Sequence, residues 1–504
     1  MATNLRTGPA ERPDASDEAW PEPAGSDRGQ RRRRLTRLAP ILLAAALFGI
    51  YTLYSLLRHA HLGTAGYDLG IFTQAVREYA HGNAPMVSIK APGFNLLGDH
   101  FSPGLAVLAP FYLLWPNVRL LLVAQAALLA VSAIPVTRLA IRRLGVPGGV
   151  AIGVAYGLSW GIQGAIGFDF HEVALAVPLL AFSMVALAER RWRTALCCAL
   201  PLVLVKEDLG LTVAAIGGYL MLRRRWRAGG VAVAVGIGSF LLTTLLIIPR
   251  LDHLFHTYRY WGVVTHDRAN TGSAPRPADL WRLLLDLPHQ AITPAGKPFL
   301  LLAVFGVTAF VAVRSPLALI AVPTLLWRLA STNPLYWSTG PVHYNSILMP
   351  IVFVALVDGL TRLRAGAPRP ARVGARLAPA AVLLIGLFAL PHLAFWDLSR
   401  PATYRADQHA AAARELTGRV PSDARVSAGN YLIPLLVDRC RLVIMFPDVR
   451  LTPVDYIVID TTRLYGVPRP HDEQVAALAE VPSRGFEKIA ERDGIVLFRR
   501  APTG

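Results

Sequence analysis

The chain has 504 residues, of which 53% are hydrophobic and only 17% are charged, and its mean hydropathy is +0.41. Soluble proteins carry about a quarter charged residues, so this composition excludes an ordinary soluble protein and favours a membrane protein. The net charge of +18 does not indicate nucleic-acid binding, because the arginines stand in short loops beside apolar runs, as the positive-inside rule describes. The three cysteines, Cys197, Cys198 and Cys440, form neither a disulfide framework nor a zinc motif.

The chain begins with a polar segment that precedes the first apolar run. Residues 1–37 are rich in Pro, Asp, Glu and Arg and are predicted to be a disordered basic cytoplasmic tail. The apolar run Leu38–Leu57 is long enough to cross about 30 Å of hydrocarbon. It exceeds the apolar core of a signal peptide, so we interpret it as an uncleaved anchor.

Clusters of arginine end successive apolar runs and predict the topology. These clusters contain Arg138, Arg142 and Arg143; Arg190, Arg191 and Arg193; Arg223, Arg224, Arg225 and Arg227; Arg314; and the basic loop Arg362–Arg376. If every cluster is cytoplasmic, an even number of spans separates each pair of neighbouring clusters. The short run Gly104–Pro116 is then an interfacial or re-entrant segment. The run Thr194–Leu222 becomes two short helices that meet at its central charges, because one helix would hold those charges in lipid.

The resulting prediction is an all-α polytopic membrane protein with about eleven transmembrane helices. Its transmembrane domain covers residues 38–398, with large outer loops at 58–103 and 250–298. The remaining predicted spans are Gly149–Gly167, Gly229–Pro249, Phe299–Val313, Pro316–Leu329, Ser346–Leu360 and Leu377–Phe395. The expected location is the bacterial plasma membrane, with the N-terminus in the cytoplasm.

Apolar spans stop after Leu398, and residues 399–504 are predicted to form a small extracytoplasmic α/β domain. Helical periodicity appears at 407–416 and 473–479. Short β-rich runs at 425–427, 456–459 and 495–498 predict strands.

The first outer loop carries two polar motifs. In the run Tyr67–Gln74, apolar residues recur at helical spacing, which predicts an amphipathic helix lying on the membrane with Asp68 at its start. Asp68 is either an N-cap or a carboxylate that acts as a general base at the mouth of a membrane cavity. Asp99 and His100 end the loop, where they either bind a cation, a phosphate or a sugar hydroxyl, or form an ordinary polar rim.

Three further polar motifs join predicted spans on the same side. Asp169, His171 and Glu172 form either an interfacial turn or a binding site whose spacing is not diagnostic of a metal. Lys206, Glu207 and Asp208 are either a self-neutralising ion cluster or a site in which the lysine binds a lipid phosphate. His343 and Tyr344 belong either to an aromatic belt or to the same site. All five motifs fall on one face of a topology that was derived from arginines alone.

Together these motifs resemble a bacterial membrane-protein family known as domain of unknown function 2079. The matching segments are Tyr67–Gln74, Asp99–Pro103, Phe170–Glu172, Lys206–Asp208, His343–Tyr344 and Asp455–Asp460. That family is distantly similar to the GT-C superfamily of polyprenol-dependent glycosyltransferases, which have many spans and an acidic residue in the first outer loop. Asp68 matches that acidic residue by position, whereas the second acidic residue that is frequent in the superfamily is replaced by Leu69.

The resemblance implies an inverting glycosyltransferase that takes a sugar from a polyprenyl-phosphate donor to a cell-envelope acceptor. In that hypothesis Asp68 is the catalytic base and Lys206, with His343, holds the donor phosphate. The other predicted binding residues are Asp99, His100, Asp169, His171, Glu172, Glu207, Asp208 and Tyr344. The cofactor stays open, with a divalent cation as one alternative, and the expected partners are membrane lipids, the donor and the envelope acceptor. A transporter or flippase of a lipid-linked or anionic substrate, or a non-catalytic scaffold, are the alternative functions.

Overall fold

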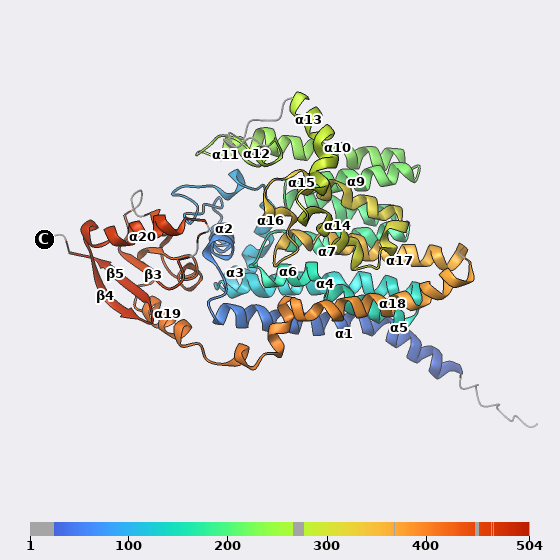
Figure 1. The fold of residues 1–504 in the computed structure, drawn as a ribbon, viewed down its shortest axis with the longest axis horizontal. Helices are drawn as coiled ribbons and strands as arrows, with labels where there is room; N and C mark the ends of the chain where they lie inside the picture. The colour runs from blue at the N-terminus through green and yellow to red at the C-terminus, as the bar shows by residue number, and fades with distance from the viewer. Residues whose placement is uncertain are drawn as a thin grey trace, which may run out of the picture.

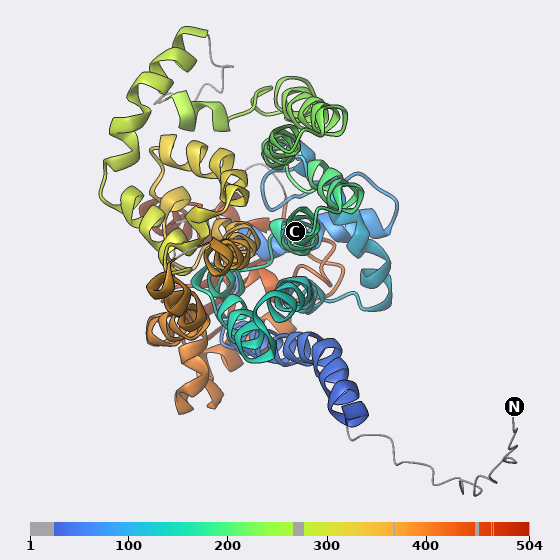
Figure 2. The same cartoon turned by 90° about the vertical axis from the view of Figure 1, so that its right-hand side faces the viewer.

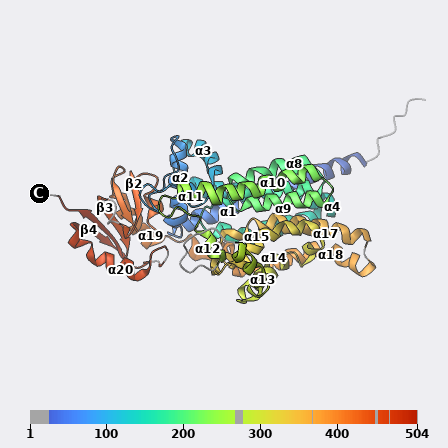
Figure 3. The same ribbon diagram turned by 90° about the horizontal axis from the view of Figure 1, so that it is seen from above.

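A computed structural model describes residues 25–265, 277–366, 368–448, 453–464, 466 and 468–502. It consists of a helical bundle with a small α/β domain at one end, and the connection between the last two bundle helices lies at the other end (Figure 1). The same separation of domain and bundle is visible from above (Figure 3), and a view along the long axis shows many of the helices end-on (Figure 2).

The bundle contains helices of very different lengths. They are α1 (Gly25–Ala60), α4 (Arg119–Leu144), α5 (Val146–Gly157), α6 (Trp160–Gly167), α7 (Val173–Ala188), α8 (Trp192–Ala199), α9 (Leu209–Leu222), α10 (Trp226–Leu242), α14 (Gly296–Gly306), α15 (Val322–Ala330), α17 (Leu348–Gly366) and α18 (Arg369–Ala389). Six helical stretches in the described residues are long and apolar enough to cross a membrane, and six more are apolar but shorter. The six long stretches and five of the shorter ones correspond to the predicted spans, and the sixth shorter one is Pro103–Leu114. The predicted polytopic helical fold is therefore confirmed.

The helices differ in how much lipid-compatible surface they expose. In α17, 78% of the apolar stretch is buried, so this helix is central to the bundle. In α18 only 22% is buried, and Leu384 and Phe388 are 64% and 85% exposed. Large exposed apolar side chains on a long helix suit contact with lipid.

The helical part of the chain begins earlier than predicted. Helix α1 starts at Gly25, well before Leu38, so residues 25–37 are helical and not a disordered tail. Arginine is a strong helix former, so the arginine-rich run can continue the helix past the apolar stretch. Residues 1–24 of the predicted tail lie outside the described residues.

The two ambiguous segments have the predicted character. Gly104–Pro116 contains only a 3₁₀ turn at Pro103–Leu108 and the short helix α3 (Ala109–Leu114), whose Leu113 and Leu114 are largely exposed. Thr194–Leu222 is two helical pieces, α8 continued by a 3₁₀ turn at Leu200–Leu204 and then α9, with Lys206–Asp208 at the break between them. The predicted hairpin is thus confirmed.

The C-terminal domain is a five-stranded mixed sheet with two helices. The strands are β1 (Arg425–Ala428), β2 (Leu442–Met445), β3 (Tyr456–Asp460), β4 (Phe486–Arg492) and β5 (Ile495–Arg500), in the order β2-β1-β3-β5-β4. Strands β2, β1 and β3 are parallel, whereas β5 is antiparallel to both β3 and β4. The helices are α19 (Gln408–Gly418) and α20 (His471–Glu480). The predicted strands and helices correspond to β1, β3, β5, α19 and α20, and β2 and β4 were not predicted.

The first outer loop packs against this domain. It contains a π-helical turn at Gly66–Gly70 followed by α2 (Ile71–Ala80), and Ile71–Val76 are all buried. Arg77 donates hydrogen bonds to the backbone oxygens of Val437 and Cys440, and the N–H of Gly66 donates to Asn430 O at 2.7 Å. The prediction that this helix lies on the membrane is therefore wrong, because its apolar face is covered by protein.

The second outer loop supplies three helical pieces. They are α11 (Ile248–Leu251), α12 (Tyr260–Thr265) and α13 (Pro277–Ile292), and the short α16 (Pro334–Trp337) follows later in the chain. Residues 266–276 of the predicted loop 250–298 lie outside the described residues. Helices α2, α3, α11, α12 and α16 all lie at the end of the bundle that faces the C-terminal domain (Figure 1).

Candidate functional site

The five polar motifs predicted from the sequence meet at the domain end of the bundle. The most direct link is an ion pair between Lys206 Nζ and Glu172 Oε1 at 2.8 Å, with Glu172 completely buried. Burial alone would lower the pKa of Lys206, but Glu172, Glu207 and Asp208 outweigh it and hold the pKa well above its ordinary value. Lys206 is therefore a permanent cation. An ammonium has three donors, and among the described residues only Glu172 accepts from Lys206, which leaves two donors for a ligand.

A second acidic residue of the same helix break binds the first outer loop. Glu207 Oε1 lies 2.7 Å from His100 Nδ1, and Glu207 Oε2 accepts from the backbone N–H of Phe101 at 3.0 Å. Tyr258 from the second outer loop donates to Glu207 Oε1 at 3.1 Å. Glu207 thus joins both outer loops to the bundle. Because these contacts occupy both of its carboxylate oxygens, Glu207 has little hydrogen-bonding capacity left for a ligand.

Asp99 and Asp169 are held by cations in the same way. Asp99 pairs with Lys90 and accepts from the hydroxyl of Tyr260 at 3.2 Å. Burial raises the pKa of Asp99, but Lys90 and His100 outweigh it and hold the pKa below its ordinary value. Asp169 pairs with Arg58 at 2.5 Å and accepts from the backbone N–H of Ala65 at 2.7 Å. Both carboxylates therefore fix the path of the first outer loop.

The two predicted histidines lie face to face. The ring centroids of His171 and His343 are 3.4 Å apart with an interplanar angle of 14°, and Tyr344 adjoins His343 at 4.0 Å. His171 Nδ1 is 2.5 Å from Glu172 Oε2, so Glu172 contacts both His171 and Lys206. Within the described residues, both ring nitrogens of His343 are buried without a hydrogen-bond partner. A buried polar atom without a partner is costly unless a ligand satisfies it.

Asp68 belongs to the same electrostatic cluster, and it is not an N-cap. The N-cap of the π-helical turn is Ala65, and Asp68 lies inside that turn, half-buried. Burial raises the pKa of Asp68 to about 7, the carboxylates of Asp169 and Glu172 add to this effect, and Lys90 and Lys206 oppose it. Asp68 and Lys206 are therefore close enough to influence each other. A carboxyl group with a pKa near neutrality is suited to exchange a proton.

Two further groups in this region have unsatisfied polar atoms. Asp208 Oδ1 is buried without a partner in the described structure, and burial raises the pKa of Asp208 to about 6. Arg328 of α15 is completely buried, and it donates to Asn345 Oδ1 at 2.6 Å and to Tyr336 O at 2.5 Å. Its Nη1 is left without a partner among the described residues. The sequence analysis did not single out Arg328, although a charge inside the apolar run Pro316–Leu329 is a signal that could have identified it.

No arrangement of ligands for a metal is evident in the part of the chain that the structure describes. No group of three or more His, Cys, Asp or Glu residues there could hold a metal ion. The carboxylates of Glu172, Asp99 and Asp169 are paired with lysine or arginine, and that of Glu207 is hydrogen-bonded to His100, Phe101 and Tyr258. The alternative that the site uses a divalent cation stays a prediction.

A comparison with known protein families identifies the family to which this chain belongs. Residues 58–497 match the family described as "Predicted membrane protein (DUF2079)". The chain belongs to this family. The segments on which the resemblance was based all lie within the match, so the predicted family is confirmed. No curated protein matches the chain.

Solved structures with the same fold identify a structural relative of this DUF2079 member. ArnT from Cupriavidus metallidurans, in the structure bound to undecaprenyl phosphate, superimposes with a TM-score of 0.53 at 15% identity, covering 92% of this chain and 98% of ArnT. The apo structure of ArnT gives a TM-score of 0.48 at 13% identity, covering 95% and 100%. The match to the undecaprenyl-phosphate-bound structure shows that the DUF2079 chain shares the GT-C-like fold of ArnT over nearly its whole length, as the sequence resemblance implied.

Proposed function

We propose that this protein is a GT-C-like glycosyltransferase that takes a sugar from a polyprenyl-phosphate donor. The observation that carries the proposal is that a buried, cationic Lys206 and the carboxyl group of Asp68, whose pKa is raised to about 7, lie in one electrostatic cluster. A cation suits a lipid phosphate, and a carboxyl with a pKa of about 7 suits a general base. The fold supports the proposal, because a protein of that fold has been crystallised with undecaprenyl phosphate.

In the proposed reaction, Asp68 accepts the proton of the acceptor hydroxyl while the hydroxyl oxygen bonds to the anomeric carbon of the sugar. The bond between that carbon and the phosphate oxygen breaks, and the electron pair leaves with the polyprenyl phosphate. Lys206 stabilises the phosphate that departs, and Arg328 Nη1 is a second cation in reach of the same cluster. Attack from the face opposite the phosphate inverts the anomeric carbon.

The remaining predicted residues divide between positioning and binding roles. Asp99, Asp169 and Glu207 hold the two outer loops in place through their cationic and hydrogen-bonded partners. His343 and Asp208 have unsatisfied atoms and are the proposed contacts for sugar hydroxyls. His100 contacts Glu207, His171 and Tyr344 lie against His343, and Glu172 pairs with Lys206, so these four residues position the groups that would bind the donor.

The test is sugar transfer by the purified protein in lipid nanodiscs. Polyprenyl-phosphate sugars with a radiolabelled sugar are supplied one at a time with an envelope extract as acceptor. Asp68→Asn preserves the shape of the side chain and removes the proton acceptor, so transfer should fall by about 10²- to 10⁴-fold. Undecaprenyl phosphate should still raise the melting temperature of this variant, because the lysine that binds the phosphate is intact. Unchanged transfer in Asp68→Asn would exclude Asp68 as the base, and movement of labelled lipid across the membrane without transfer would favour a flippase.

A further inference from the structure

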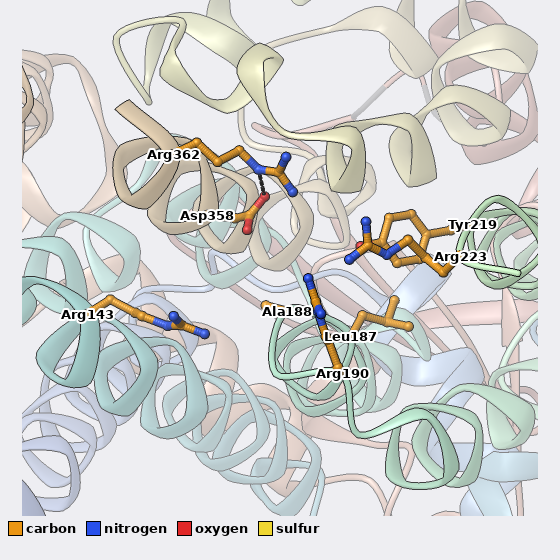
Figure 4. Close-up of a pocket in the computed structure, with 8 residues that line it drawn as sticks. All are labelled: Arg143, Leu187, Ala188, Arg190, Tyr219, Arg223, Asp358 and Arg362. Carbon is orange, nitrogen blue, oxygen red and sulfur yellow. Dashed lines mark hydrogen bonds and ion pairs between the residues drawn. The ribbon is translucent and has the colours of Figure 1, made fainter. Parts of the chain in front are cut away.

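The opposite end of the bundle holds a second polar pocket that the proposed reaction does not use. Its volume is about 410 Å³, and its polar lining consists of Arg143, Arg190, Arg223, Arg362, Asp358 and Tyr219. These residues come from α4, α9, α17 and the turn after α7, which are far apart in the sequence. Figure 4 shows the side chains of Arg143, Arg190 and Arg223 directed into the same space beside the Asp358–Arg362 pair.

The pocket has a large excess of positive charge. Its one carboxylate, Asp358, accepts from Arg362 Nε at 2.7 Å and from Ser315 at 2.6 Å. The nearby Glu189 is engaged by Arg142 and Arg191. Within the described residues, the guanidinium groups of Arg143, Arg190 and Arg223 have no hydrogen bond or ion pair. Four arginines and one aspartate give the lining a net charge of +3.

The backbone beside the pocket is unusual for its residue type. Arg190 follows the end of α7 with φ = 59°, in the left-handed region that glycine usually occupies after a helix. Arg224 follows the end of α9 with the same φ, so both helix turns place arginine where glycine would be relaxed. A strained residue at a cavity is reason to look for a role of its side chain, and here that role is to bring charge to the pocket.

A second cavity extends the pocket toward an apolar surface. It has a volume of about 420 Å³, shares Arg190 and Arg223 with the first, and is also lined by Trp192 and Leu222. Leu222 is 69% exposed and Trp226 at the start of α10 is 62% exposed. Unpaired guanidinium groups beside exposed apolar side chains match a phosphate with acyl chains attached, whereas a free anion would need only the guanidinium groups.

We propose that this pocket binds the phosphate of an anionic phospholipid in the membrane leaflet on the arginine side. The positive-inside rule accounts for arginines at this end of the bundle, but it does not require three unpaired guanidinium groups to converge on one cavity. Arginine binds phosphate through paired N–H donors, and basic pockets between membrane helices bind anionic headgroups. The bound lipid would join α4, α7, α9 and α17 at the end farthest from the C-terminal domain.

The experiment compares two double variants that remove the same charge from the same two turns. Arg190→Gln/Arg223→Gln changes the pocket, and the control Arg193→Gln/Arg227→Gln changes exposed arginines outside both cavities. The full chain is reconstituted with phosphatidylglycerol in phosphatidylcholine, and retained lipid is measured by native mass spectrometry. Phosphatidylglycerol affinity should fall roughly thirtyfold in the pocket variant, since each basic residue contributes about 1 kcal/mol. The control should stay close to wild type.

Three results would overturn the proposal. Equal losses in both double variants would mean that the lipid responds only to the charge of the whole face. Wild-type retention in the pocket variant would mean that these arginines do not bind the headgroup. Binding of inorganic phosphate that depends on Arg190 and Arg223, without any such dependence of lipid retention, would assign the pocket to a soluble anion. A conservative pair, Arg190→Lys/Arg223→Lys, should keep part of the affinity and shows whether a weakened variant is folded.

Discussion

Within the described structure, Asp68 and Asp208 differ from the other carboxylates of the site because neither has a cationic partner in direct contact. Asp99, Asp169, Glu172 and Glu207 each lie against a lysine, an arginine or a histidine. Asp68 only experiences Lys90 and Lys206 from a distance, and these do not offset burial and the neighbouring carboxylates. The site therefore contains two carboxyl groups whose pKa is raised toward neutrality, that of Asp68 to about 7 and that of Asp208 to about 6.

This difference predicts how transfer depends on pH. A base must be ionised, and the pKa of Asp68 is raised to about 7, so kcat/KM should fall about tenfold for each pH unit below 7 and level off above it. The raised pKa also means that ionisation of Asp68 is less favourable in the folded protein than in the unfolded chain, where its pKa is 3.8. This ionisation therefore lowers the free energy of unfolding as the pH rises above 3.8, and the loss is complete above pH 7. Asp68→Asn should therefore unfold at no lower temperature than wild type at pH 8. A flat profile from pH 5 to 8 would place the base elsewhere.

Lys206 combines a structural role with the proposed binding role, and the two can be separated. Lys206→Met leaves Glu172 buried without its ammonium partner, which should destabilise the fold by about 3 kcal/mol, at the lower end for broken buried pairs because His171 is adjacent. Lys206→Met/Glu172→Gln removes both charges and should recover most of that stability in thermal unfolding. Transfer and stabilisation by undecaprenyl phosphate should stay lost. Recovery of transfer in the double variant would show that Lys206 serves only to neutralise Glu172.

At the scale of single residues, sequence reasoning identified the polar motifs but not their pairing. Charges and histidines between apolar runs are visible in the sequence because lipid disfavours them. Which carboxylate is neutralised depends on residues that come from other loops, such as Arg58 and Lys90, and these had no local signal. Arg328 was overlooked because its run was interpreted only as a span.

At the scale of elements, the first outer loop shows that an amphipathic pattern does not indicate what covers the apolar face of a helix. The apolar stripe of α2 was predicted correctly, but the stripe is compatible with lipid or with protein. The C-terminal domain provides the protein surface. One face of its sheet, including Val426, Val443 and Leu497, belongs to the same hydrophobic cluster as α2, and the opposite face packs on α20. No pattern within 67–79 could indicate that contact.

The close approach of Gly66 to Ile433 offers a test of this docking. A Cβ on Gly66 would lie 2.5 Å from Ile433 Cβ and 2.6 Å from its Cγ2 and Cδ1, so Gly66→Ala should cost about 1–3 kcal/mol in thermal unfolding. Ile433→Gly removes all three obstructing atoms, including the Cβ that alanine would keep, so Gly66→Ala should cost much less in that background, a non-additive result. The matched control is Gly418→Ala, which meets nothing within 4 Å. Additive losses would mean that the two residues are not in contact.

At the scale of the whole molecule, the count of spans depended on charge rather than on hydrophobicity. The segment Pro103–Leu114 is apolar enough to be mistaken for a span, and parity of the arginine clusters removed it. The bundle and the helix break at Lys206–Asp208 could be predicted from hydrophobicity and charge, and three of the five strands of the C-terminal sheet from short β-rich runs. Strands β2 and β4 could not, because β2 is only four residues long and β4 is largely exposed and charged.

The orientation of the molecule in the membrane is the remaining prediction of that argument. The described helices place the site and the C-terminal domain at one end of the bundle and the arginine pocket at the other (Figures 1 and 4). If the positive-inside rule holds, the arginine end is cytoplasmic and residues 399–504 lie outside. Single cysteines can be placed at Ser483 in the C-terminal domain and at Thr194 at the start of α8, both exposed, after Cys197, Cys198 and Cys440 are replaced. In intact spheroplasts, a membrane-impermeant maleimide should label Ser483→Cys almost completely and Thr194→Cys only after lysis. Labelling in the reverse pattern would invert the whole assignment. Labelling of both in intact spheroplasts, with a cytoplasmic marker protein still protected, would mean that an even number of spans separates the two positions, so that a short helix between them, such as α14 or α15, had been assigned to the wrong class.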